Sequence, residues 1–237
     1  MKSERIPVKS FSADNGFIGK MQKLVREEVL PYQYNILNDA IPGIEKSHAI
    51  ENIRLAAEKL RGKDVKPDEF YGMVFQDSDV AKWIEAAAYA LAAGEDPKLE
   101  KAVDETIQLY GASQHEDGYV DSYFTVKCPD KMWTNICDAH ELYCAGHMME
   151  AAVAYYEVTG KRELLDIMSK SADCIYEQFM KKNTRAYPGH PEVELALMRL
   201  WRATGNEKYK ELAKHFVDVR GQAPNYFVEE KKNRGWN

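Results

Sequence analysis

The sequence contains no long apolar run. A membrane-spanning helix takes about 20 consecutive apolar residues, and no segment of this 237-residue chain approaches that length. The first eleven residues, MKSERIPVKSF, also lack the continuous apolar stretch of a secretion signal. We therefore expect a cytoplasmic protein with no membrane-spanning segment.

Positive charge is scarce relative to negative charge. The 32 Lys and Arg residues are outnumbered by 38 Asp and Glu residues, which gives a formal net charge of -6. Such a chain has no overall basic field to hold nucleic acid or an anionic membrane. A neutral or cationic small substrate is easier to accommodate. The GxSxG, P-loop and GxGxxG patterns are absent as well.

Cysteine is rare and unpaired in the sequence. The four cysteines form no CxxC pair and follow no secretion signal; they are Cys128, Cys137, Cys144 and Cys174. We expect reduced thiols, as is usual inside the cell.

Alternation with a period of two, the mark of a half-buried strand, is also uncommon. A helical period dominates instead, as in the apolar positions Val80, Trp83, Ile84, Ala87, Ala88 and Leu91. Segments that start at Glu85, Glu150 and Glu194 each consist of a helix, a glycine and another helix. The sequence therefore predicts repeated α-hairpins.

A glycine occupies the same place in each repeat, at Gly94, Gly160 and Gly205. We expect each to end the first helix in the left-handed region, where glycine has no Cβ penalty. The helix from Leu142 to Val158 is apolar nearly all round, whereas the next helix carries many charges. The first helix is therefore predicted to be buried and the second to face water.

Alternating buried and amphipathic helices must form two layers. Residues 17–37 and 48–61 predict one further helix pair, which makes about four hairpins in all. We expect residues 1–237 to form a single all-α domain, an α/α toroid rather than a straight solenoid.

Two long polar and aromatic loops precede buried helices, at residues 113–140 and 181–194. Asp138 is a candidate cap for the helix that carries His140, and His190 stands just before Pro191, which suits a first helical turn. If the buried helices ring one axis, these histidines meet at one mouth.

Other loop residues are expected at the same mouth. Gln114, Asp117 and Tyr119 would join the histidines, with Trp83, Tyr119 or Trp133 available to stack on a ring. Carboxylate, amide and imidazole groups pair well with vicinal hydroxyls, so this set suits a sugar. The alternative is that these residues only cap helices and close loops.

Two further chemistries are conceivable from spacing alone. His140, Cys144 and His147 lie on one helical stripe, as a metal site would require, although such residues in a buried helix are more often packing choices. Glycoside hydrolysis usually needs two carboxylates, for which Asp117, Glu141, Glu192 and Glu194 are candidates. Glu141 and Glu192 fit equally well as first-turn acids that interact with a helix dipole.

Several ordered motifs point to a known family. QHEDGY, HELYCAGH and YPGHPEVELAL, flanked by DSDVAKWIEAAAYALA and VDVRGQAPNYFVEE, resemble glycoside hydrolase family 127, the β-L-arabinofuranosidases. The resemblance extends from about Phe11 to Glu230. It implies part of an (α/α)6 barrel, since this chain supplies about eight of the twelve helices. It also implies retaining hydrolysis of β-L-arabinofuranosides and a truncated catalytic domain that ends at Asn237.

The resemblance assigns roles to particular residues. His140 and His190 match family histidines that contact the arabinose, and Gln114, Asp117 and Trp83 lie in family motifs as further pocket residues. The family's nucleophile is a cysteine thiolate on a zinc ion completed by cysteines and a glutamate. No position here matches those ligands, so zinc is implied by the family without ligands in this chain.

An inactive chain is therefore expected, one that forms a homo-oligomer or is completed by another polypeptide. Two other functions remain open. One is another carbohydrate enzyme of the (α/α)6 type, such as an unsaturated glucuronyl hydrolase or a sugar epimerase. The other is a non-catalytic helical-repeat module that binds a protein partner.

Overall fold

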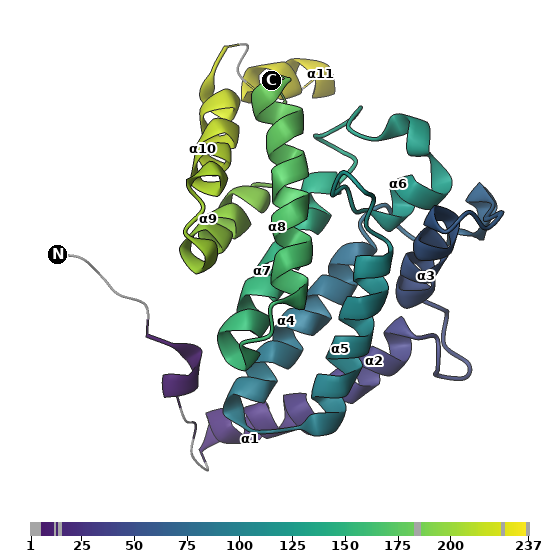
Figure 1. Ribbon diagram of the computed structural model, residues 1–237, viewed down its shortest axis with the longest axis vertical. Helices are drawn as coiled ribbons and strands as arrows, with labels where there is room; N and C mark the ends of the chain where they lie inside the picture. The colour runs from purple at the N-terminus through teal and green to yellow at the C-terminus, as the bar shows by residue number, and fades with distance from the viewer. Residues whose placement is uncertain (1–5, 12, 14–15, 183–185, 224–225, 236–237) are drawn as a thin grey trace.

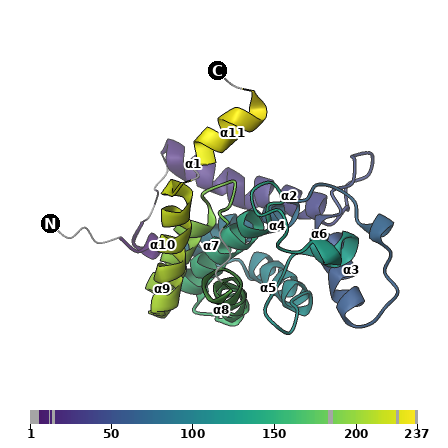
Figure 2. The same cartoon turned by 90° about the horizontal axis from the view of Figure 1, so that it is seen from above.

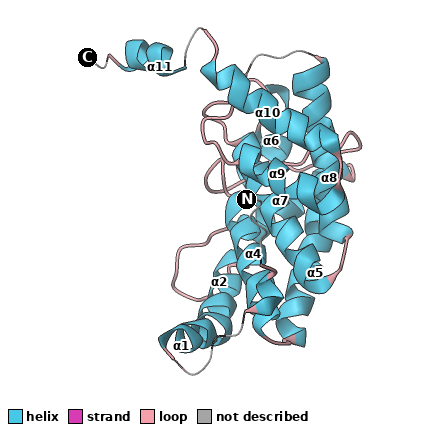
Figure 3. Cartoon of the chain, turned by 90° about the vertical axis from the view of Figure 1, so that its left-hand side faces the viewer, coloured by secondary structure: helices cyan, strands magenta, loops and turns pink. Residues whose placement is uncertain are grey.

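A computed structural model describes residues 6–11, 13, 16–182, 186–223 and 226–235. These residues form helices and loops without a strand (Figure 3), which confirms the all-α prediction. Residues 183–185 of the predicted loop at 181–194 and the end at Asn237 lie outside the described residues. The α-helices are α1 Phe17–Leu24, α2 Leu30–Leu37, α3 Ala49–Leu60, α4 Asp77–Ala93, α5 Pro97–Ala112, α6 Ser122–Lys127, α7 Glu141–Thr159, α8 Glu163–Tyr176, α9 Val193–Thr204, α10 Glu207–Gly221 and α11 Tyr226–Arg234.

Shorter helical segments join or extend these helices. A π-helical segment, Val25–Val29, links α1 to α2, and a second one, Glu177–Lys181, continues α8. Single 3-10 turns cover Val8–Ser10, Pro67–Glu69 and Pro129–Lys131. No helix of the described chain is both long and apolar enough to cross a membrane.

The three predicted hairpins are α4–α5, α7–α8 and α9–α10 (Figure 1). Gly160 and Gly205 end α7 and α9 in the left-handed region, with φ of 76° and 73°. Gly94 does not, because its φ of 169° is extended, so that prediction is wrong. A Cβ at Gly94 would lie 2.7 Å from the guanidinium of Arg26, the far end of a flexible side chain.

The hairpins build two layers. Helix α7 packs against α4, α8 and α9, and its apolar circumference is buried accordingly. The amphipathic helices α5, α8 and α10 pack beside one another outside α4, α7 and α9. Figure 2 shows α4 and α7 between the row of α8, α5 and α3 on one side and α1–α2 on the other. We call α4, α7 and α9 the inner helices.

Helices form where residues 17–37 and 48–61 predicted them, but they do not pair as a hairpin. Helix α2 packs on α4, where the Trp83 indole N–H donates to the Leu30 carbonyl at 3.1 Å. Helix α3 packs on α5 and α6 and is fastened to a later loop, since the Asn52 amide donates to the Tyr71 carbonyl at 2.7 Å. These long-range contacts override the sequence proximity of the two helices.

One apolar core holds the layers together. It extends from Leu30 on α2 to Phe216 on α10, with the largest fully buried rings at Tyr110, Tyr155 and Phe179. Each such ring removes a large apolar area from water and contributes about 1.5–3 kcal/mol of transfer free energy. A small second cluster lies between α3 and α6. The core therefore fixes the inner helices and the loops at their N-terminal ends.

Candidate functional site

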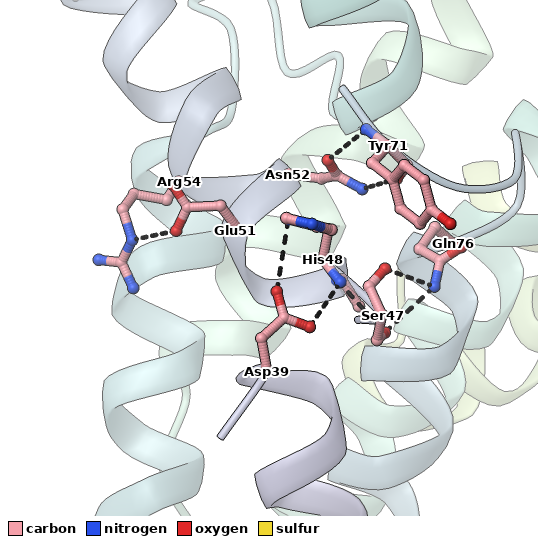
Figure 4. Close-up of polar contacts among 9 residues, drawn as sticks. Asp39, Ser47, His48, Glu51, Asn52, Arg54, Tyr71 and Gln76 are labelled. Atoms are coloured by element: carbon pink, nitrogen blue, oxygen red, sulfur yellow. Dashed lines mark hydrogen bonds and ion pairs between the residues drawn. The ribbon is translucent and has the colours of Figure 1, made fainter. Parts of the chain in front are cut away.

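The N-terminal ends of α3, α4, α7 and α9 converge on one side of the protein. The Phe75 ring, just before α4, lies 5.2 Å from the His140 ring, and the His140 and His190 rings lie 5.1 Å apart. The Gln76 amide reaches Ser47, just before α3, at 3.2 Å (Figure 4). The structure thus brings the two predicted histidines together at a shared mouth.

His140 is held in a strained backbone conformation. It is the N-cap of α7 with φ of 63° and ψ of 9°, in the left-handed region that non-glycine residues rarely occupy. Such strain often accompanies a functional position. His140 Nδ1 lies 2.6 Å from the Asp138 carbonyl, which can only accept, so Nδ1 carries a proton. The neutral ring therefore offers Nε2 as an acceptor.

The prediction that Asp138 caps helix α7 is wrong. The Asp138 side chain bonds to Asn135 within the preceding loop, and α7 has no side-chain cap hydrogen bond. Helix α9 likewise begins at Val193 rather than at Pro191, after a turn at residues 191–192. Both helix starts are therefore set by the loops that pack on them.

Close backbone contact brings the two loops together. A Cβ at Gly189 would overlap the carbonyl oxygen of Cys137, so only glycine allows this approach. The contact lies next to His190 on one loop and three residues before His140 on the other. Gly189 thus allows the two loops that carry the histidines to lie in contact.

Tyr143 connects these histidines to the inner helices. Its ring lies 5.6 Å from His140, 5.0 Å from His190 and 4.5 Å from His147. Its hydroxyl lies 3.1 Å from Lys82 Nζ on α4, which also lies 3.1 Å from the hydroxyl of Ser78. Tyr143 was missed from the sequence, although its i+3 spacing from His140 places it on the same helical face.

Below this cluster lies a network of half-buried charges. Arg199 on α9 bonds to Glu85 at 2.9 Å and to Glu150 at 2.8 Å, and its other nitrogen reaches the Tyr89 hydroxyl at 3.1 Å. One guanidinium therefore ties α9 to both α4 and α7. Glu192, the N-cap of α9, lies on the histidine side of this network.

Glu192 and His147 meet between the network and the mouth. Glu192 Oε1 is buried and lies 3.4 Å from His147 Nδ1. Burial, with the nearby Glu150 carboxylate, raises the pKa of Glu192 to about 7. Burial also lowers the pKa of His147. The distance is that of an ion pair, but burial shifts the pKa of each group in the direction of its neutral form.

Gln114 and Asp117 lie away from the histidines. The Gln114 amide donates to the Ile167 carbonyl on α8 at 2.8 Å and to Gly118 at 3.0 Å. Asp117 is exposed and accepts from the backbone N–H of Tyr119 at 3.0 Å. The Gln114 contact holds the loop against α8, and the Asp117 contact closes a turn within the loop. A sugar-binding role for either residue stays a prediction.

Trp83 has a structural anchor and borders a pocket. Its side chain is only 3% exposed and its ring stacks on Tyr34 at 4.7 Å. It also forms part of the wall of a pocket between α2 and α4. Trp83 therefore packs between α2 and α4, and a sugar-binding role for it stays a prediction.

Two of the predicted carboxylates, Glu141 and Glu194, have partners within the protein. Glu141 is buried and accepts from the Tyr119 hydroxyl at 2.7 Å and from the Trp133 backbone at 3.0 Å. Burial raises the pKa of Glu141, although these two hydrogen bonds lower it. Glu194 is buried, and its carboxylate lies 3.6 Å from the guanidinium of Arg220. Neither carboxylate faces the two histidines in the contacts of the described residues.

Comparison with known proteins identifies the family. The model of the family described as "Beta-L-arabinofuranosidase, GH127 catalytic domain" matches residues 12–235. The chain belongs to glycoside hydrolase family 127. This confirms the family resemblance of the sequence motifs.

Relatives of this family 127 chain are much longer. A non-reducing end β-L-arabinofuranosidase from Bifidobacterium longum subsp. longum is 40% identical over 226 residues, which cover 87% of this chain and 33% of that protein. A crystal structure of a GH127 β-L-arabinofuranosidase from Geobacillus stearothermophilus T6 matches with a TM-score of 0.81 and 51% identity, over 94% of this chain and 34% of that one. The chain thus spans about a third of these relatives' length.

A second solved structure supports the same fold. A GH127 β-arabinofuranosidase matches with a TM-score of 0.81 and 32% identity, over 94% of this chain and 36% of that one. The layered hairpins of this family 127 chain are therefore part of an all-α helical barrel, as the sequence predicted.

The zinc site expected from the family does not fit the described residues. One group places three possible metal-binding atoms within 4.8 Å, at His147, Glu150 and Glu192. This group contains no cysteine, and the carboxylate of Glu150 already forms an ion pair with Arg199. Cys144 is buried on α7 and belongs to no such group. The cysteines described here are therefore not assigned to zinc.

Proposed function

We propose that this chain forms the sugar-binding part of a β-L-arabinofuranosidase barrel, in which His140 and His190 contact the arabinofuranosyl ring. The observation that carries the proposal is the pair of imidazoles 5.1 Å apart at the mouth of the inner helices. The names of the family model and of the relatives supply the sugar.

The chemistry of the cluster suits a polyhydroxylated ring. The Asp138 carbonyl fixes the His140 tautomer, so Nε2 accepts a hydroxyl proton. His190 is exposed beside it and supplies a second ring nitrogen. Tyr143 packs against both imidazoles and keeps the distance between them when the sugar ring binds.

This proposal assigns the binding of the sugar, but not its hydrolysis, to the described residues. The described cysteines do not gather into a nucleophile site, so no covalent step is derived from them. We expect this 237-residue chain to bind methyl β-L-arabinofuranoside and to release product from a chromogenic β-L-arabinofuranoside only at background rate. Turnover that is abolished by replacing one of its own cysteines would contradict this.

The binding claim is tested by calorimetric titration with methyl β-L-arabinofuranoside. His140→Gly removes the imidazole and relieves the left-handed strain, so the fold should be kept while affinity falls at least tenfold. His48→Gly is the matched control, because His48 is the N-cap of α3 with φ of 54° and pairs with Asp39 at 3.3 Å instead (Figure 4). Equal affinity in the wild type and His140→Gly would refute the proposal.

An exposed apolar face is consistent with a completing polypeptide. Ile18, Met21, Val25 and Val29 follow a helical stripe from α1 into the π-helical segment, and all four are exposed. Stripes of this kind usually mark an association surface. We infer that the remainder of a family 127 domain, or a second copy, covers it. A monodisperse monomer in light scattering would contradict this inference for the isolated chain.

A further inference from the structure

Two buried carboxyl groups, Asp77 and Asp121, lie together where α4 and α6 begin. Asp77 is the first residue of α4 and is 3% exposed, and Asp121 is the N-cap of α6 and is 2% exposed. We propose that this pair holds a single proton, on Asp121, and that the proton keeps α6 and the loop before it fastened to α4. Loss of the proton at alkaline pH then releases this segment. We call the two carboxyls the latch.

Asp77 has the partners of an ionised carboxyl. One of its oxygens accepts from the backbone N–H of Ser122 at 2.8 Å, and the other accepts from the Ser122 hydroxyl. Both contacts join the start of α4 to the first residue of α6. A carboxylate only accepts hydrogen bonds, so two donors suit the charged form. Asp77 therefore carries the negative charge of the latch.

Asp121 is satisfied at only one oxygen. Its Oδ1 accepts from the backbone N–H of Phe124 at 3.0 Å, as expected of an N-cap. Its Oδ2 is buried and has no hydrogen-bond partner among the described residues. A buried oxygen that shares a negative charge without a donor is very unfavourable, whereas protonation removes that charge. The geometry therefore places the proton on Oδ2 of Asp121.

The surroundings of the latch do not offset a second negative charge. The titratable groups that act on the pair or respond to it are Asp79 on α4, Tyr110 on α5, Tyr119 in the loop, and Glu141 and Cys144 on α7. None of them is basic. Burial, followed by the charge of Asp77, raises the pKa of Asp121 well above its usual range, although backbone hydrogen bonds of α6 lower it. Two like charges at this depth would repel each other.

Basic side chains near these elements have other partners. Lys82 on α4 acts on Asp79 and Cys144, and its ammonium lies 3.1 Å from the Tyr143 hydroxyl. Lys59 on α3 reaches α6 but donates to the Val126 carbonyl at 2.8 Å. Among the described residues, no printed hydrogen bond or ion pair joins a basic side chain to Asp77 or Asp121. A proton therefore does the work that a cation would do in a buried ion pair.

The latch fastens a segment that supports the mouth of the inner helices. The loop before α6 carries Tyr119, whose hydroxyl donates to Glu141 at 2.7 Å. Glu141 follows His140 at the start of α7. A second negative charge in the latch favours the entry of water and local opening of the joint between α4 and α6. We therefore expect release of the segment to loosen the start of α7 as well.

Asp121→Asn tests the position of the proton. The amide keeps the oxygen that caps α6 and puts an N–H group in place of the protonated Oδ2, so it copies the neutral carboxyl. Because the pKa of Asp121 is raised above 3.8 in the folded protein, the stability due to its proton is complete below about pH 3.8 and falls as the pH rises. In urea unfolding of the full chain, Asp121→Asn should have the higher midpoint at pH 9 and almost the same midpoint as the wild type at pH 4.

Two further variants complete this experiment. Asp77→Asn should lower the midpoint at pH 9, because an amide N–H replaces one of the two acceptors that face Ser122. Asp96 is the N-cap of α5 and accepts from the Leu99 N–H at 3.1 Å, but it is only half-buried, so Asp96→Asn is the matched control and should run parallel to the wild type. A higher midpoint at pH 9 for Asp77→Asn instead of Asp121→Asn would overturn the proposal, as would a curve for Asp121→Asn that is parallel to the wild type or below it.

Hydrogen exchange of the wild-type chain tests the release without a substitution. Exchange of residues 113–127, corrected for the intrinsic effect of pH, should become at least about tenfold faster between pH 6 and pH 9, while exchange in α8 changes by less than about twofold. Asp121→Asn should keep residues 113–127 protected at pH 9. Unchanged protection in the wild type, or an equal loss of protection in Asp121→Asn, would show that the latch does not exist.

Discussion

The Glu192 carboxyl should make the protein less stable as the pH rises. Its pKa in the folded protein is raised from 4.5 to about 7, first by burial and then by Glu150. The folded state therefore holds a proton that the unfolded chain releases at lower pH, and stability falls between about pH 4.5 and pH 7. Glu192→Gln replaces the carboxyl with a neutral group of the same shape and removes this loss.

The magnitude follows from the pKa. One pKa unit corresponds to about 1.4 kcal/mol, so a pKa raised from 4.5 to about 7 corresponds to about 3 kcal/mol at high pH. Glu192 is only half-buried and water can relax around the ion. We therefore expect Glu192→Gln to be about 1–3 kcal/mol more stable than the wild type at pH 8, with almost no difference at pH 4.5.

Urea unfolding followed by circular dichroism at pH 4.5, 6, 7 and 8 measures this difference. The other charged groups that face Glu192 are Glu150, Glu85, Lys82 and His147, and all are present in both proteins. Glu116→Gln, an exposed loop carboxyl, is the control and should run parallel to the wild type. Parallel curves for Glu192→Gln, or a variant less stable than the wild type at pH 8, would refute the reasoning.

Three further predictions concern the fold. Gly118→Ala should cost more than about 2 kcal/mol of stability, because a Cβ there would overlap a carbonyl of α8 at a φ of +98°. Gly160→Ala should cost only about 1 kcal/mol, because its φ is +76° but no atom lies within 4 Å of the added Cβ. Equal losses of stability in thermal unfolding would contradict this. Arg199→Met should cost about 3–5 kcal/mol at neutral pH, since it leaves two glutamates unpaired, and the urea midpoint measures the loss. Burial raises the pKa of Cys174 to about 12, so its thiol should resist iodoacetamide at pH 8 in the folded chain and react once unfolded, as mass spectrometry would detect.

Features that depend on local sequence were predictable. Hydrophobic periodicity located the helices, and Gly160 and Gly205 end helices in the left-handed region because only the local backbone decides this. The positions of His140 and His190 at the starts of successive inner helices followed from the same repeat. Motif strings around these residues also identified family 127.

Features that depend on contacts between distant segments were not predictable. Gly94 has an extended backbone and lies beside Arg26 of another helix, and helices α2 and α3 pack on different partners instead of on each other. The Gln114 amide is taken up by a carbonyl of α8, which no spacing in the sequence reveals. Each of these outcomes depends on a partner in another element.

The sequence by itself thus determined the helices, their alternation between buried and amphipathic faces, and the family. Helical period, glycine caps and motif order are all properties of neighbouring residues. Only the tertiary structure decided how the four helix starts converge, how close the two imidazoles lie, and how Lys82 on α4 reaches Tyr143 on α7. Distances between side chains on different helices are set by packing of the shared core, which no single segment encodes.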